Sequence, residues 1–184
     1  MFRRVVILSL VVFAVASLSE VAAAEFPPKV KVAGHELILN GMGSRKKTLL
    51  QLYLAGLYLT DTSSNPEAII AGDATMAIRI EITSGFVSQE KMVAALSEGF
   101  ESSTNGNTRP LEREIQQFRQ CFAGKITKGD VFEIVYVPSR GSFVVKNGEV
   151  KGVVEGLPFK QALFGIWLSD KPADQGLKNK LLGG

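Results

Sequence analysis

The sequence has very little of the chemistry on which metal sites, disulfide frameworks and charge-relay catalysis depend. Its 184 residues include one cysteine and one histidine. A single cysteine excludes an internal disulfide framework, and a single histidine excludes a multi-histidine metal cage. A Ser-His-Asp or Cys-His catalytic arrangement is disfavoured for the same reason. We therefore expect no metal site and no cofactor.

A large charge excess is also missing. The formal net charge is +3, and residues 1–24 hold two basic residues and one acidic residue, so removing them leaves +2. A basic excess this small argues against nucleic acid as a partner. The hydrophobic fraction of 46% is too high for a disordered chain, and the length suits one domain.

The N-terminus has the three-part pattern of a secretory signal peptide. Arg3 and Arg4 precede an apolar run over residues 5–16, and Ala22-Ala23-Ala24 offers small residues at the right spacing for cleavage before Glu25. The alternative is an uncleaved anchor, although the run is short for a bilayer span. We expect residues 1–24 to be removed, leaving a periplasmic or secreted domain over 25–184 with no stable membrane anchor.

The rest of the chain alternates between strand and helix signals. Residues 40–47 are a glycine-rich basic stretch that predicts a loop, and the apolar run 49–59 predicts a central strand bent at Gly56. Asn147-Gly148 is the strongest hairpin signal. The further expected strands cover residues 30–32, 36–39, 76–83, 130–137, 142–146 and 149–154, and the expected helices cover 66–70, 88–100, 110–122, 159–167 and 177–182. This order predicts an α+β fold, a largely antiparallel sheet with helices packed on one side.

Few side chains suggest a binding site. Arg45 lies in the glycine-rich stretch, where a guanidinium suits a carboxylate, although a solvated turn with ordinary surface cations is the simpler interpretation. Tyr53 and Tyr58 fall on opposite faces of a regular strand, and a buried hydroxyl needs a partner. If Arg45 and Tyr53 face one cavity, they make a polar end for a fatty-acid-like anion. Cys121 is expected to be a buried packing residue.

Three segments together resemble the bacterial branch of the chalcone isomerase-like family. They are LNGMGSRK (39–46) running into LYLAGLYL (52–59), the helix at 88–100, and ALFGIWLSDKP within 159–172. The resemblance spans nearly all of residues 25–184. It implies an open-faced β-sandwich, in which helices wrap a large antiparallel sheet and a ligand cleft lies between them.

The resemblance also assigns roles to individual positions. The Gly-x-Gly-x-Arg pattern implies that Arg45 is the family's active-site arginine, and Tyr53 falls where the isomerases have a catalytic threonine. A tyrosine beside the arginine is similar to the fatty-acid-binding pattern. Lys91 and Glu98 fall where the isomerases need a tyrosine and an asparagine, and Gly165 falls near a late polar residue, so these three are candidate cleft-lining residues.

The differences from the isomerases at these positions favour a non-catalytic protein that binds a small lipophilic anion such as a fatty acid, with Arg45 and Tyr53 at the polar end. One alternative is an intramolecular lyase, a chalcone isomerase-type isomerase acting on a phenolic enone. A second alternative is a partner-binding module with no ligand cleft, in which Glu98 pairs with Arg45. The oligomeric state is left open.

Overall fold

The computed structural model describes residues 26–184, so the expected signal peptide lies outside the described residues. The chain forms one seven-stranded antiparallel sheet in which the strands lie side by side in sequence order. The strands are β1 (Lys29–Val32), β2 (His35–Lys47), β3 (Leu50–Leu59), β4 (Met76–Ile82), β5 (Val131–Val137), β6 (Gly141–Lys146) and β7 (Glu149–Val154).

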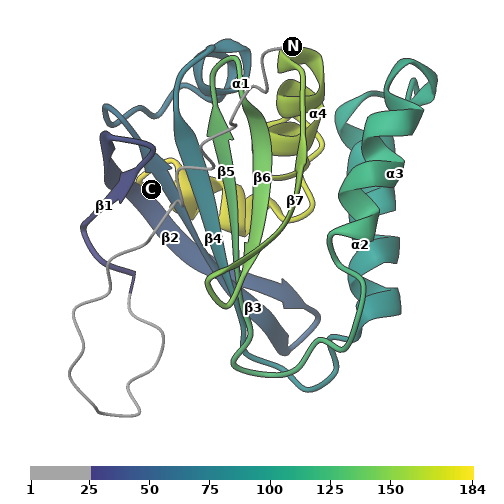
Figure 1. Cartoon of the computed structure of the whole chain (residues 1–184). Helices are drawn as coiled ribbons and strands as arrows, with labels where there is room; N and C mark the ends of the chain where they lie inside the picture. The colour runs from purple at the N-terminus through teal and green to yellow at the C-terminus, as the bar shows by residue number, and fades with distance from the viewer. Residues whose placement is uncertain (1–25) are drawn as a thin grey trace.

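Five α-helices accompany the sheet, and Figure 1 shows α4 and α5 behind it, with α2 and α3 alongside. They are α1 (Pro66–Ala71), α2 (Gln89–Ser103), α3 (Glu112–Gln120), α4 (Leu157–Leu168) and α5 (Gln175–Leu181). A short 3₁₀ helix, η1 (Arg109–Leu111), precedes α3. The predicted α+β fold with an antiparallel sheet is confirmed. No helix of the described part is both long enough and apolar enough to span a bilayer.

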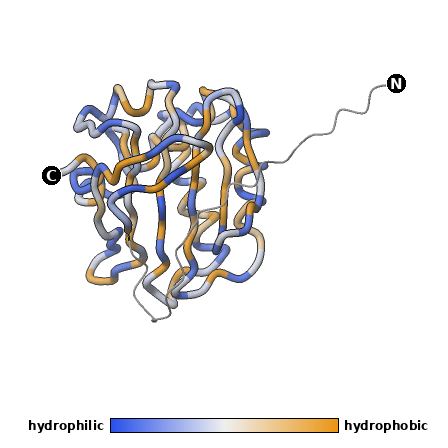
Figure 2. The backbone as a smooth tube through the Cα atoms, turned by 60° about the vertical axis from the view of Figure 1, so that its left-hand side comes forward, coloured by the Kyte–Doolittle hydropathy of each residue, from blue (hydrophilic) through white to orange (hydrophobic). Residues whose placement is uncertain are grey.

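The sheet separates a large core from a small one. The alternating side chains of β4 show this directly, because Met76, Ile78 and Ile80 join the helix-side core while Ala77 joins a smaller cluster on the back of the sheet. Figure 2 shows the same alternation of hydropathy along the strands. Tyr53 packs against the helix-side core and Tyr58 lies in the back cluster, so the predicted opposite orientation of the two tyrosines is confirmed.

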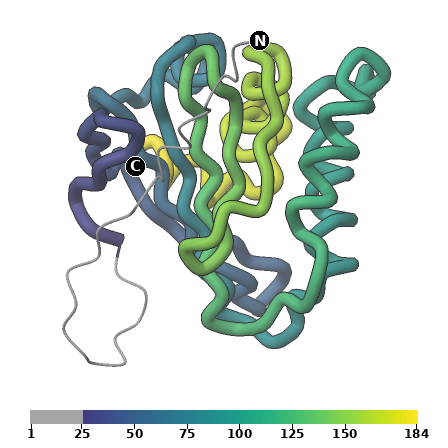
Figure 3. The backbone as a smooth tube through the Cα atoms, in the orientation of Figure 1, coloured from purple at the N-terminus to yellow at the C-terminus, as the bar shows by residue number. Residues whose placement is uncertain are grey.

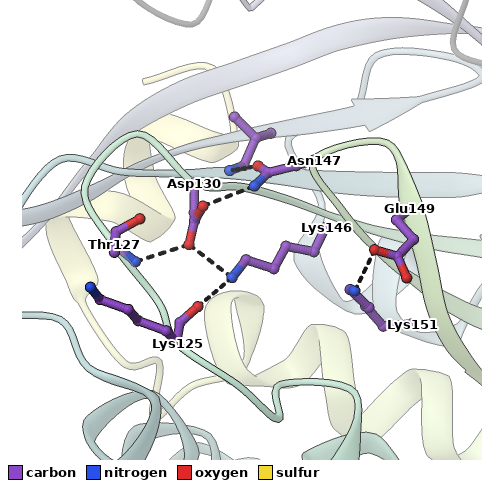
Figure 4. A network of polar contacts seen from close by, with 8 residues as sticks. Lys125, Thr127, Asp130, Lys146, Asn147, Glu149 and Lys151 are labelled. Atoms are coloured by element: carbon purple, nitrogen blue, oxygen red, sulfur yellow. Dashed lines mark hydrogen bonds and ion pairs between the residues drawn. The ribbon is translucent and has the colours of Figure 1, made fainter.

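Local signals placed several boundaries correctly. Ser88 is the N-cap of α2 and its side chain accepts a hydrogen bond from the Lys91 amide. Asn147 and Gly148 have φ of 51° and 82°, which the two-residue turn between β6 and β7 requires. Figure 4 shows that this turn is also tied to the loop before β5, since Asn147 and Lys146 both bond to Asp130.

The glycine-rich stretch 40–47 is not a loop, and this prediction was wrong. It forms the second half of the 13-residue strand β2. Its glycines are needed for close approach rather than for turning, because a Cβ at Gly41 would lie 2.1 Å from the carbonyl oxygen of Lys180 and one at Gly43 would lie 2.7 Å from Lys180 Cβ. Helix α5 therefore packs directly on the backbone of β2.

Candidate ligand-binding cleft

A cleft of about 400 Å³ opens between the start of β3 and the N-terminal half of α2. This volume lies within the range of small-molecule sites, about 300–1,000 Å³. Figure 3 shows the β2–β3 hairpin reaching toward the start of α2. The walls are mainly apolar, with two lysines among them: Lys47, Thr48, Leu50, Leu52, Tyr53, Phe86, Val87, Lys91, Met92 and Ala95.

A β-bulge aims two consecutive residues of β3 into this cleft. Arg45 is paired with Tyr53 and Lys46 with Gln51, so Leu52 is an extra residue between the two pairs. In a regular strand Leu52 and Tyr53 would point to opposite faces, yet both line the cleft. The bulge therefore builds the inner wall of the site.

Tyr53 lines the cleft and carries a hydroxyl. Its oxygen accepts a hydrogen bond from Trp167 Nε1 at 3.1 Å. Burial raises the pKa of Tyr53, although the indole hydrogen bond and the positive charge of Arg45 act in the opposite direction. The phenol therefore stays protonated at neutral pH. Its own proton has no acceptor among the described residues.

Arg45 forms an ion pair with Asp174, which precedes α5. Its guanidinium lies 3.2 Å from Asp174, and both side chains are largely buried. Asp174 is also the N-cap of α5 and accepts from the amides of Leu177 and Lys46. Burial acts to raise the pKa of Asp174, but those amides and Arg45 outweigh it and lower the pKa. Arg45 thus lies beside Tyr53 in the sheet but is not among the lining residues.

The rim of the cleft carries two exposed ammonium groups. Lys47 ends β2, and Lys91 lies in the first turn of α2. The Lys91 ammonium donates to the carbonyl oxygen of Phe86 at 3.0 Å, which holds it against the β4–α2 loop. Neither lysine forms an ion pair within residues 26–184, so both charges are available to an anion.

Two of the three candidate cleft-lining residues, Glu98 and Gly165, do not line this cleft. Glu98 is exposed on α2 and does not line it, and the internal partner of Arg45 is Asp174 instead. Gly165 lies where α4 crosses α2, and a Cβ there would lie 3.0 Å from Ser103 Cβ. Lys91 does line the cleft. The ligand-binding role expected for Arg45 and Tyr53 stays a prediction.

Sequence reasoning missed three features of the site. The sequence assigns Lys47 only to a basic stretch, and Phe86, which follows Gly85, belongs to no motif. Ala95 on α2 is exposed and also lines the cleft. Met92 and Ala95 are three residues apart, and this spacing is the sequence signal that places both on one face of α2. No group of three or more His, Cys, Asp or Glu side chains within residues 26–184 is placed to hold a metal.

Comparisons with known proteins agree with this architecture. A family model described as chalcone isomerase-like matches residues 18–183. The crystal structure of an Arabidopsis thaliana fatty-acid binding protein superposes with a TM-score of 0.67 and 18% sequence identity, covering 85% of this chain and 90% of that one. At this identity the likeness shows the fold alone. No curated protein sequence gives a significant match.

Proposed function

The chain belongs to the chalcone isomerase-like family, and from that premise we propose that it is a non-catalytic binder of a small lipophilic anion such as a fatty acid. The observation that carries the proposal is the apolar cleft of about 400 Å³ with Lys47 and Lys91 at its rim. The fatty-acid binding protein of the same fold supports the choice of ligand class.

The apolar walls of the cleft suit the tail of such a ligand, and the lysines at its rim suit the charged end. Leu52, Val87 and Met92 offer apolar surface, and each ligand methylene buried there contributes about 0.8 kcal/mol. The ammonium groups of Lys47 and Lys91 attract the charged end, and the Tyr53 hydroxyl donates a hydrogen bond deeper in the cleft. We propose that Arg45 acts indirectly, since its pairing with Asp174 fixes the end of β2 that carries Lys47.

Binding rather than turnover is supported by the polar groups that the cleft contains. Cyclisation of a phenolic enone requires groups that hold the oxyanion and polarise the carbonyl. The polar side chains lining this cleft are Lys47, Thr48, Tyr53 and Lys91. Tyr53 has a raised pKa, so it stays a hydrogen-bond donor and does not serve as a base at neutral pH.

Removing the rim charges is expected to weaken fatty-acid binding about tenfold. The double variant Lys47→Gln/Lys91→Gln loses two attractions of about 1 kcal/mol or less each, while the apolar walls are unchanged. The measurement is titration with a fluorescent fatty acid, together with native mass spectrometry of protein purified without detergent.

A fatty alcohol of equal chain length is the matched control, because it has the same tail and no charge. The double variant should bind the alcohol as well as the unaltered protein does. Arg45→Gln is expected to have a smaller effect, about threefold, since that side chain does not line the cleft. Absence of fatty-acid binding by the unaltered protein, or turnover of chalcone at this cleft, would count against the proposal.

We further propose that the chain is exported, with residues 1–24 removed as a signal peptide. The pattern of Arg3 and Arg4, an apolar run and small residues before Glu25 supports this. Intact-mass measurement of the protein recovered from an exporting bacterial host should give a chain beginning at Glu25. Recovery of the uncleaved chain in the membrane fraction would favour the anchor instead.

A further inference from the structure

The end of the sheet that carries the cleft also presents the two most exposed large apolar side chains of the described residues. Leu49 is 97% exposed and Phe86 is 65% exposed. Leu49 lies in the two-residue turn between β2 and β3, and Phe86 lies in the loop between β4 and α2. A leucine this exposed contributes almost nothing to the core, so its side chain is open to contact with another surface.

Both side chains are presented by ordered local structure. Thr48, the other residue of the turn, has a φ of 57°, which is strained for a β-branched residue. The Phe86 amide donates to Ser84 Oγ at 3.2 Å, and Lys91 Nζ donates to the Phe86 carbonyl at 3.0 Å. The turn therefore exposes Leu49 between the cleft-lining residues Thr48 and Leu50, and the braced loop exposes Phe86, which lines the cleft itself.

The same end of the molecule is basic. We define the cleft end by the β2–β3 and β6–β7 turns, the β4–α2 loop with the first turn of α2, and the α3–β5 loop. With the two strand residues that flank each of these segments included, the cleft end carries six lysines and four acidic residues: Lys46, Lys47, Lys91, Lys125, Lys128, Lys146, Glu81, Glu90, Asp130 and Glu149. Lys146 is neutralised by Asp130, as Figure 4 shows. Five lysines remain outside the ion pairs of the described chain.

The opposite end of the sheet has the reverse charge. Counted in the same way, its connecting loops, their flanking strand residues and the first turn of α1 carry five acidic residues and two basic ones: Glu36, Asp61, Glu67, Asp73, Glu155, Lys31 and Arg140. The molecule is therefore polarised along the strands. A negatively charged surface would attract the cleft end and repel the other.

We propose that the cleft end docks on an anionic phospholipid bilayer, with Leu49 and Phe86 entering the interface and the lysines facing the lipid head groups. Exposed apolar tips surrounded by lysines combine the two attractions that hold peripheral proteins on such membranes. A second copy of the chain fits this end poorly, because it would bring two basic surfaces together. In this orientation the cleft opens onto the bilayer, from which it could take up its ligand. Ligand uptake rests on the proposed function, whereas the docking proposal does not.

The test uses residues of the cleft end that do not line the cleft. These are Leu49→Ser and the double variant Lys125→Gln/Lys128→Gln, compared by co-sedimentation with vesicles of equal parts phosphatidylglycerol and phosphatidylcholine. Losing the leucine should reduce vesicle partitioning about tenfold. Losing the two lysines should reduce it about 25-fold, from about fivefold for each.

Matched controls come from elsewhere on the surface. Val153→Ser removes an apolar side chain that is 44% exposed near the far end of β7, and Lys31→Gln removes an exposed lysine of β1. Each should change partitioning less than about twofold, because neither lies at the cleft end. All variants keep the same N-terminus, so differences between them report on the substituted residues alone.

Several outcomes separate docking from its alternatives. Binding should be lost on pure phosphatidylcholine vesicles, and also when salt rises from about 0.1 M to about 1 M, which shortens the Debye length from about 10 Å to about 3 Å. Equal partitioning of Leu49→Ser and the unaltered protein would overturn the proposal. So would a dimer in sedimentation velocity that Leu49→Ser dissociates, because the tips would then contact a second copy. Fatty-acid affinity in solution should be unchanged in these variants, so failure of docking and failure of ligand binding are distinguishable.

Discussion

Replacing Lys160 by methionine is expected to lower the free energy of unfolding by about 3 kcal/mol. Lys160 lies on α4 and is fully buried, and its ammonium donates to the carbonyl oxygens of Ile69, Ile70 and Gly72 at 2.7, 2.9 and 2.6 Å. These carbonyls lie at the C-terminal end of α1, where the helix itself supplies no N–H donors for them. Methionine fills the space but leaves all three unpaired, and relief from burying an ammonium offsets only part of that cost.

The pH dependence of the unaltered protein gives a second readout. Burial lowers the pKa of Lys160 from 10.5 to about 8, while the nearby Asp73 carboxylate opposes the shift. Between about pH 8 and 10.5 the unfolded chain therefore binds more protons than the folded one, so stability rises with pH in that window. The gap between the unaltered protein and Lys160→Met should widen from pH 8 towards pH 10.5.

Urea denaturation at several pH values measures both effects. Lys128→Met is the control, since that lysine is exposed in the α3–β5 loop and its loss should change stability by less than about 0.5 kcal/mol. If Lys160→Met matched this control, the ammonium would not be what completes the end of α1.

The burial of Lys160 and its hydrogen-bond acceptors could not be predicted from the sequence. The apolar spacing of Phe159, Ala162 and Leu163 predicted α4 correctly, as a helix with one wide apolar face. The structure buries α4 on nearly all sides, from Phe159 to Leu168. A helix that is apolar all round leaves no exposed face, so a lysine within it must find internal acceptors. Those acceptors lie about 90 residues away in sequence, and local patterns do not reveal them.

The same distinction between local and long-range features applies to the candidate site and the strands around it. The strand alternation of residues 76–82 and the Asn147-Gly148 turn are local signals, and both were predicted correctly. The Arg45–Asp174 pair joins residues 129 positions apart, and the Tyr53–Trp167 hydrogen bond joins residues 114 apart. Such contacts depend on how α4 and α5 fold back on the sheet. The resemblance to a family identified Arg45 and Tyr53, but only the packing shows that Arg45 already has a carboxylate partner.

The glycines of β2 are visible in the sequence, but the reason for them is the packing of α5, which follows more than 130 residues later. Substituting one of them is therefore expected to lower stability strongly. Gly41→Ala should destabilise the protein by about 3 kcal/mol. The added Cβ would lie 2.1 Å from the carbonyl oxygen of Lys180 and 2.8 Å from that of Leu181. These are backbone atoms, so no side chain can rotate away and α5 itself must move. The displacement would also strain the bond from Asn40 Nδ2 to the Leu181 carbonyl, 2.8 Å long.

The same substitution should weaken fatty-acid binding, although Gly41 does not line the cleft. Helix α5 begins at its N-cap Asp174, which holds both the Arg45 guanidinium and the Lys46 amide at the end of β2. Moving α5 therefore loosens the strand end that positions Lys47 at the rim. Gly85→Ala is the matched control, because a Cβ there meets nothing within 4 Å and its φ is not positive. Urea denaturation and fatty-acid titration should separate the two variants. If both behaved like the unaltered protein, direct packing of α5 on β2 would not be what holds the cleft in shape.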